Sequence, residues 1–129
     1  MKVLASDFAS LKDLAAFKAA KAKGQSDKQA FAVGDNGVGC WGALTAQERT
    51  YMCALPPDDM IAKFGSVKAA KNAKVMVTYK GVQVLCTLAD RMPWKKNIKN
   101  GCGIDLNPAV LKALRLKSPI KIAVEWQWA

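Results

Sequence analysis

Residues Lys74 to Leu88 read KVMVTYKGVQVLCTL, and this stretch decides the fold class of the chain. Alternate positions are apolar in both halves, which places one face of each half against a core. Lys80-Gly81 separates the halves, and a two-residue link that contains glycine is typical of the tight turn of a β-hairpin. The sequence therefore predicts two antiparallel strands, Lys74–Tyr79 and Val82–Leu88, within a mainly β domain.

Further extended segments flank this hairpin along the chain. Thr50–Leu55 is largely apolar and ends at Pro56-Pro57, while Ile120–Trp128 alternates weakly and is expected to close the sheet. One helix interrupts these strands, because Asn107 is a favoured N-cap and Pro108 suits the first turn of a helix. The pattern predicts β-strands with short helices between them.

The first 29 residues differ in character from the rest of the chain. Apolar residues recur at helical spacing from Ser6 to about Ala22, and Gly24 supplies a stop. The polar segment Gly24–Gln29 is typical of a linker. We therefore expect an N-terminal amphipathic helix with its linker over residues 1–29, and a β domain over residues 30–129.

Length and composition restrict the class of protein. A chain of 129 residues, 51% of them hydrophobic, forms one domain and needs neither metal nor disulfide to fold. No apolar run approaches the roughly 20 residues that cross a bilayer, so we expect no membrane span, and the first residues lack a secretory signal. The net charge of +10 favours an anionic partner. Lysine outnumbers arginine 17 to 3, which suits diffuse attraction to an acidic polymer better than recognition of nucleic acid.

The chain contains no histidine and four cysteines. Histidine-based catalytic triads and zinc sites are therefore excluded, and the cysteines lack the C-x-x-C spacing of a zinc site, so we expect no metal and no cofactor. An even number of cysteines in a small basic domain indicates two disulfides and an extracellular or cell-wall location, with reduced core thiols as the alternative. Among three possible pairings, Cys40 with Cys53 and Cys86 with Cys102 would close short loops.

Two aspartates lie at the ends of predicted extended segments. Asp90 follows the second hairpin strand, and Asp105 comes just before the Asn107 cap. The basic loop 91–104 joins them, carries Trp94, and could fold over a groove that brings the two carboxylates together. Paired carboxylates that flank a sugar are the usual means of cleaving glycosidic bonds. The structural alternative is that Asp90 accepts hydrogen bonds from turn amides and Asp105 supports the N-terminus of the following helix.

Several segments in a fixed order carry a family resemblance. They are CALPPDDM (53–60), KVMVTYKGVQVLCTL (74–88), ADRMP (89–93), GIDLNPA (103–109) and VEW (124–126), with the glycine-rich GDNGVGCWG (34–42) before them. Through these segments, residues from about 30 to 128 resemble the double-psi β-barrel of expansins. The rare lipoprotein A group of lytic transglycosylases is similar through the same segments.

The resemblance implies a six-stranded double-psi barrel with a polysaccharide groove across one face. The strand-end aspartate of the family falls on Asp90, and its second aspartate falls on Asp105. The chain departs from the family at Met92, where an aromatic residue is usual, and at Phe31 and Val33 on the expected first strand, where hydroxyl residues are usual. It also lacks the histidine that pairs with the aspartate in the transglycosylases.

Other residues would complete such a groove around the catalytic candidates Asp105 and Asp90. The expected substrate-binding residues are Asp35, Trp41, Arg91, Trp94 and Lys95. Trp126 and Trp128 share a face of the last strand and are expected in the core.

The function predicted from these residues is binding and remodelling of cell-wall polysaccharide, either peptidoglycan or a plant wall glycan. It would proceed by lytic cleavage, with Asp105 as acid and then base if burial raises its pKa, or by wall loosening without cleavage. The alternative is a non-catalytic protein-binding barrel, such as a protease inhibitor or a secreted effector, because a fold does not fix a function. In either case we expect a monomer.

Overall fold

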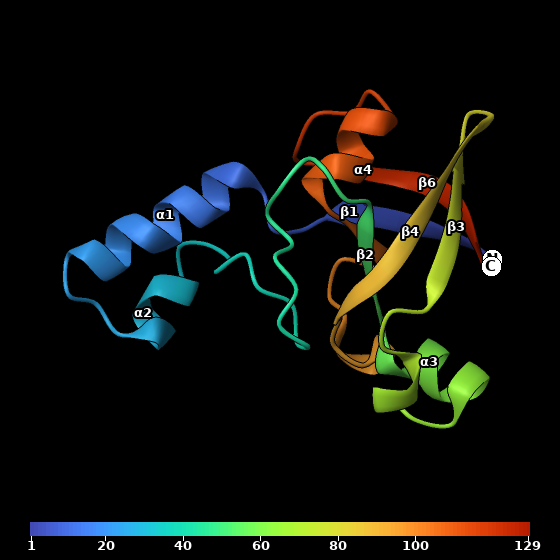
Figure 1. Cartoon of the computed structure of the whole chain (residues 1–129), viewed down its shortest axis with the longest axis horizontal. Coiled ribbons are helices and arrows are strands. Elements are labelled where there is room, and N and C mark those ends of the chain that lie inside the picture. The colour runs from blue at the N-terminus through green and yellow to red at the C-terminus, as the bar shows by residue number, and fades with distance from the viewer.

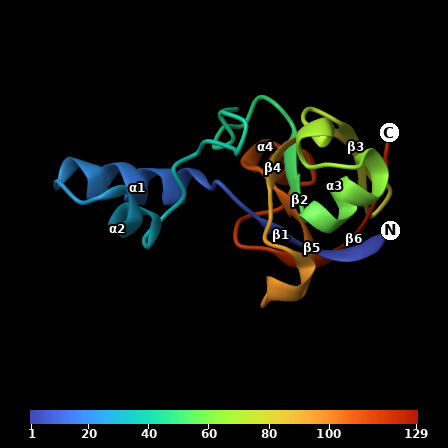
Figure 2. The same cartoon turned by 90° about the horizontal axis from the view of Figure 1, so that it is seen from below.

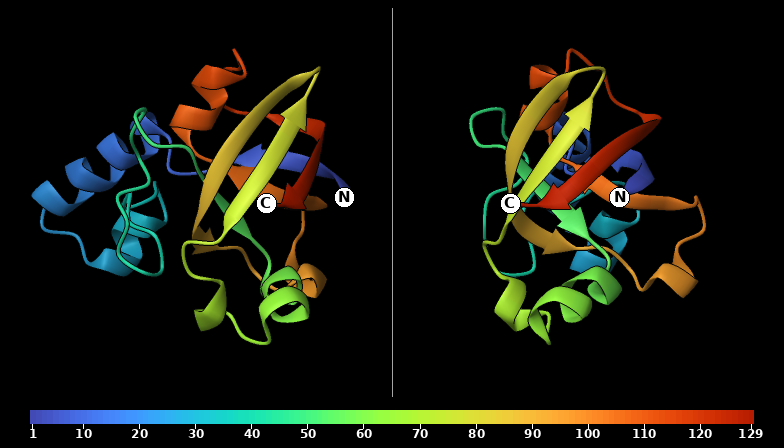
Figure 3. Two further views of the ribbon diagram at one scale, coloured as in Figure 1. Left: turned by 45° about the vertical axis from the view of Figure 1, so that its right-hand side comes forward. Right: turned by 90° about the vertical axis from the view of Figure 1, so that its right-hand side faces the viewer.

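Six strands close into a single barrel, which confirms the mainly β fold (Figures 1 and 3). The computed structural model describes residues 1–129. The strands are β1 (Lys2–Asp7), β2 (Met52–Leu55), β3 (Lys74–Tyr79), β4 (Val82–Arg91), β5 (Cys102–Leu106) and β6 (Lys121–Trp128), in the order β1-β5-β2-β4-β3-β6 around the barrel. The helices are α1 (Leu11–Ala22), α2 (Asp27–Phe31), α3 (Pro57–Phe64) and α4 (Pro108–Ala113), with short 3-10 turns η1 (Lys68–Ala70) and η2 (Lys95–Asn97).

The predicted hairpin is present as β3 and β4. Val75 pairs with Cys86 and Val77 with Val84, so the apolar faces of both strands point into the barrel. Lys80 and Gly81 both have positive φ, 46° and 79°, as the tightest hairpin turns require. The second strand continues three residues beyond its predicted end at Leu88, so Asp90 lies inside β4 and not after it.

Two pairs of strands run parallel, and this arrangement brings distant parts of the chain together. β1 is parallel to β5 and β2 is parallel to β4, whereas the other four pairs are antiparallel. Side chains from all six strands fill the interior. Trp126 is buried there, and Trp128 packs edge-on against it with ring centroids 5.1 Å apart, so both belong to the core region as predicted.

The N-terminal segment is organised differently from the prediction. Residues Lys2–Asp7 form β1, which pairs with β5 and β6 and buries Ala5 in the core. The barrel therefore begins well before residue 30, and the proposed first strand around Phe31 and Val33 does not exist. The helix predicted from Ser6 starts only at Leu11, because Ser10 caps it by accepting the N–H of Asp13 at 3.0 Å.

Helices α1 and α2 form an arm, Leu11–Phe31, that extends away from the barrel (Figures 1 and 2). α2 occupies the expected linker, because Ser26 and Gln29 form a reciprocal capping box. The rings of Phe17 and Phe31 join the two helices at 5.0 Å. α1 buries only Ala20, so it lacks the broad apolar face of the predicted amphipathic helix. None of the helices has the length and apolar character needed to cross a membrane.

All four cysteines are free thiols, so the predicted disulfides are absent and the reduced alternative describes the structure. Cys53 and Cys86 are buried together inside the barrel, where a hydrogen bond with the Cys86 thiol and burial hold the pKa of Cys53 well above its usual value. Cys40 is exposed in a loop, and Cys102 is buried in a second, smaller apolar cluster. The expected partners are thus separated because Cys53 lies beside Cys86 and not beside Cys40.

Thiol labelling tests this arrangement. We expect one thiol, Cys40, to react quickly with dithiobis(nitrobenzoate) in the folded protein, and all four thiols to react in urea. Burial and the neighbouring Asp90 carboxylate raise the pKa of Cys40, so its labelling should accelerate as the pH rises above neutral. Cys40→Ser is the control and should remove only the fast reaction. Fewer than four reactive thiols in unfolded, unreduced protein would contradict the assignment.

Candidate functional site

The two predicted aspartates, Asp90 and Asp105, lie at the same level of the barrel on two strands that have β2 between them. Ala54 of β2 pairs with Asp105 of β5 on one side and with Asp90 of β4 on the other. Ser6 of β1 pairs with Asp105 and extends the row to a fourth strand. Adjacent strands are about 4.8 Å apart, which puts the backbones of the two aspartates roughly 10 Å from each other. Strand register brings them together, whereas the sequence prediction relied on a folded loop.

Asp105 has the properties of an acid that titrates in mildly acidic solution. Its pKa is raised to about 6: burial raises it most, the Ser6 hydroxyl lowers it by donating a hydrogen bond to Oδ1, and the charges of Asp7 and Asp90 raise it. A carboxyl group with such a pKa can exchange a proton in mildly acidic solution. Burial of Asp105 therefore meets the condition on which the acid and base role in the sequence analysis depended.

Asp90 is engaged in holding the backbone in place. Its Oδ1 accepts the N–H of Cys40 at 2.9 Å and the N–H of Arg91 at 2.8 Å. Burial raises the pKa of Asp90, these hydrogen bonds lower it, and the charge of Asp35 raises it. Asp35 in turn accepts the N–H of Gly37 at 2.6 Å. Asp90 and Asp35 thus both accept hydrogen bonds from backbone amides, which is the structural role that the sequence analysis gave as the alternative for Asp90.

The surface between Asp105 and Asp90 is filled. Ala54 is only 1% exposed and packs in an apolar cluster with Met92 and Cys102, which Phe8 and Ile98 cover further. Neither aspartate lines the pocket of about 790 Å³ or the pocket of about 440 Å³. The polysaccharide groove expected from the resemblance therefore does not coincide with either of these two pockets.

The basic loop 91–104 is attached to α3. The N–H of Lys95 donates to Asp58 at 2.9 Å, and its ammonium group lies 2.9 Å from the buried carboxylate of Asp59. Lys95 is therefore committed to an ion pair that fixes η2 against the first turn of α3. Arg91 and Trp94 remain exposed and available to a partner.

The glycine-rich loop contains a structure that sequence reasoning missed, a miniature hairpin over residues 37–45, called here the tip hairpin. Val38 and Leu44 form an antiparallel bridge. Thr45 donates its N–H to the Gly37 carbonyl at 2.9 Å, and Gly39 donates to the Ala43 carbonyl at 2.8 Å. Gly42 closes the turn with φ of 93°, where a residue with a side chain is strained. The closely spaced glycines are the signal that could have indicated this turn.

Contacts on both sides attach the tip hairpin to the barrel. On one side, Gly39 lies so close to β4 that an added Cβ would be 2.1 Å from the Ala89 carbonyl oxygen, and Asp90 accepts the neighbouring N–H of Cys40. On the other side, the buried Asn107 amide donates to the Thr45 carbonyl at 3.1 Å. Trp41 packs half-buried against the core, so its predicted role as an exposed platform changes to that of an anchor.

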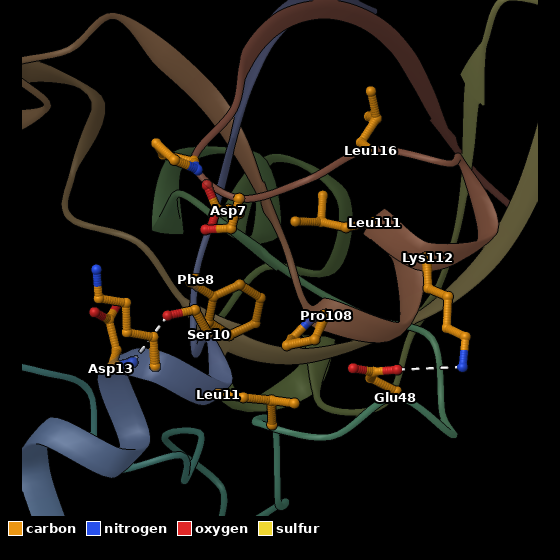
Figure 4. A pocket seen from close by; sticks show the side chains of 13 residues that line it. Asp7, Phe8, Ser10, Leu11, Asp13, Glu48, Pro108, Leu111, Lys112 and Leu116 are labelled. Carbon is orange, nitrogen blue, oxygen red and sulfur yellow. Dashed lines mark hydrogen bonds and ion pairs between the residues drawn. The ribbon is translucent and has the colours of Figure 1, made fainter.

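A pocket of about 790 Å³ lies elsewhere, between the start of the arm and α4 (Figure 4). Phe8, Leu11 and Leu116 contribute apolar surface to it. Three of its charged side chains have partners, because Asp7 accepts the N–H of Ile120 at 2.9 Å and Glu48 pairs with Lys112 at 3.2 Å. No motif in the sequence indicates this cavity.

Comparison with known proteins shows a similarity of fold and no match in sequence. A scan of protein-family models and a search of curated proteins each found no match to the sequence. Among solved structures, the chain is similar to Streptomyces papain inhibitor (SPI), with a TM-score of 0.51 and 15% sequence identity. The alignment covers 98% of this chain and 92% of that chain, so it includes the arm as well as the barrel. At this identity the similarity concerns the fold alone.

Proposed function

We propose that this barrel is a non-catalytic protein-binding module of the protease-inhibitor class, with the tip hairpin as its binding element. The observation that carries the proposal is the fixation of this hairpin by Asp90, the Ala89 carbonyl and Asn107, with Leu44 left exposed at its surface. A binding loop that is rigid before it meets its partner loses little conformational entropy on association. Such a loop can bind tightly through a small surface.

Two further observations support an inhibitor over an enzyme. Asp105, whose pKa is raised to about 6, has the filled surface around Ala54 next to it, which leaves little room for a sugar ring. The similar solved structure is, by its name, an inhibitor of papain, and its fold extends over nearly the whole of this chain. An extracellular location would suit an inhibitor of this kind.

Binding of cell-wall polysaccharide is the second candidate, and the row of Asp105, Ala54 and Asp90 favours it. Here the barrel would be of the double-psi type seen in expansins, which its two parallel strand pairs support. Ser6 supplies a hydroxyl on the true first strand, β1. The apparent lack of hydroxyl residues at Phe31 and Val33 therefore no longer counts against the resemblance. A glycan would then have to displace the side chains that cover Ala54.

An inhibition assay tests the main proposal. The full chain is titrated against papain and against a panel of serine proteases, with hydrolysis of a fluorogenic peptide as the readout. We expect saturable loss of papain activity at a one-to-one ratio, and the barrel should remain intact on a gel afterwards. Absence of inhibition across the panel would refute the inhibitor proposal.

A pelleting assay tests the second candidate in parallel. The chain is mixed with insoluble peptidoglycan, cellulose and chitin, and soluble products are analysed in the supernatant. Salt-sensitive pelleting that Asp105→Asn abolishes, or release of soluble sugar, would favour the polysaccharide function. Lys63→Ala serves as a charge control, because it removes an exposed positive charge on α3, outside the candidate site.

A further inference from the structure

Leu44 is the most exposed large apolar side chain of the molecule, at 70%. It is paired across the tip hairpin with Val38, which is 40% exposed, and paired residues of an antiparallel bridge point to the same side. The flanking residue Thr45 is buried and Ala43 is half-buried. Two branched aliphatic side chains are therefore exposed on this side of the hairpin, and Leu44 is the more exposed of the two.

The backbone of Leu44 is also available to a partner. The hydrogen bonds of the tip hairpin connect Thr45 with Gly37 and Gly39 with Ala43, which makes Val38 and Leu44 a non-hydrogen-bonded pair. In such a pair the N–H and C=O groups point away from the hairpin. The N–H of Val38 is used by the Asn36 side chain at 3.0 Å, whereas no hydrogen bond involves the N–H or C=O of Leu44.

These two features together match the way that an extended peptide is bound at the edge of another protein. In that mode main-chain hydrogen bonds hold the peptide, and a pocket for a side chain gives specificity. An extended residue with a free donor, a free acceptor and an exposed apolar side chain supplies both parts. A protease cleft recognises extended peptides through the same combination of backbone contacts and side-chain pockets.

We infer that Leu44 is the anchor residue of the inhibitor, entering the specificity pocket of a protease that prefers a branched aliphatic side chain. This inference rests on the proposed inhibitory function and specifies its contact residue and the chemistry of its partner. The Gly39–Gly42 turn limits the extended portion to the residues around Leu44, so a single pocket decides which protease is bound. Proteases whose pockets select lysine or arginine are not inhibited.

Variants of the exposed side chain test the inference in the full chain. Leu44→Ala is expected to weaken inhibition of papain by about 30-fold or more, as for a central anchor of a protein interface. Leu44→Asp is expected to abolish it, because the carboxylate would lose its hydration in an apolar pocket. Leu85→Asp is the matched control: Leu85 is 47% exposed on β4, outside the tip hairpin, and this variant should inhibit like the parent. Because Leu44 is so exposed, all variants should retain the parental melting temperature.

The outcomes separate the inference from the function on which it rests. If the parent inhibits papain and both Leu44 variants do so equally well, the anchor assignment is overturned while the inhibitor function stands. If the parent inhibits trypsin as strongly as papain, the assigned pocket chemistry is wrong. Rapid cleavage next to Leu44 with recovery of protease activity would make the hairpin a substrate and overturn the inference. If the parent inhibits neither enzyme, both the function and the anchor assignment fall.

Discussion

Replacing Asn107 with alanine lowers the free energy of unfolding by more than about 3 kcal/mol, the largest loss expected for any single polar side chain here. This fully buried amide accepts the N–H of Met52 at 3.1 Å and of Val110 at 3.3 Å, and it donates to the carbonyls of Thr45 and Thr50 at 3.1 and 3.0 Å. Alanine would leave these groups without their side-chain partner, and a buried polar group left unpaired costs about 1–3 kcal/mol.

Urea denaturation followed by tryptophan fluorescence measures this effect. Asn97→Ala is the control, because Asn97 is exposed on η2, and it should change the free energy of unfolding by less than about 0.5 kcal/mol. Since Asn107 also holds Thr45, the alanine variant should loosen the tip hairpin, with Cys40 labelling faster than in the parent. A loss of stability below 1 kcal/mol would show that water replaces the missing hydrogen bonds.

We expect the Asp105→Asn variant to have a higher free energy of unfolding than the parent above pH 6. This difference should disappear in acid. The pKa of Asp105 is about 6 in the folded protein and near 3.8 in an unfolded chain, so the folded state holds the proton more tightly. Between these values, parental stability falls as the pH rises, and above pH 6 the full penalty of up to about 3 kcal/mol applies. Asparagine carries no such charge and still offers an oxygen to the Ser6 hydroxyl.

Denaturation curves at several values between pH 4 and pH 8 test this expectation. The difference in the free energy of unfolding between variant and parent should grow across this range and level off above about pH 6. Glu125→Gln is the control, because Glu125 is an exposed carboxylate on β6, and this variant should show no comparable trend. A constant difference between Asp105→Asn and the parent would contradict the raised pKa.

Local signals explain which parts of the fold could be predicted. The β3–β4 hairpin follows from the Lys80-Gly81 turn and strict alternation, and α4 follows from the Asn107 cap, whose side chain accepts the N–H of Val110. β1 could not be predicted in this way, because it is only six residues long and both of its partners lie about a hundred residues further along the chain. Its stability comes from those distant pairings.

The candidate site was predictable in its residues more than in its geometry. Asp90 and Asp105 were expected to meet under a folded loop, whereas in the structure they lie on either side of Ala54, with which both pair. The covering of Ala54 depends on packing between Phe8, Met92 and Ile98, which come from two distant segments and carry no common motif. The disulfide prediction failed because loop length says nothing of which cysteines share the barrel interior, where Cys53 and Cys86 lie.

The pairing of β1 with β5 and β6 also has a consequence for synthesis. As the chain leaves the ribosome, β1 emerges about a hundred residues before β5 and β6, the two strands that flank it in the barrel. During most of translation its backbone donors and acceptors therefore lack their native partners, and such an open edge invites pairing with other nascent chains. Mutations that slow the synthesis of β5 and β6 should consequently increase aggregation in the cell, even where the folded protein keeps its stability.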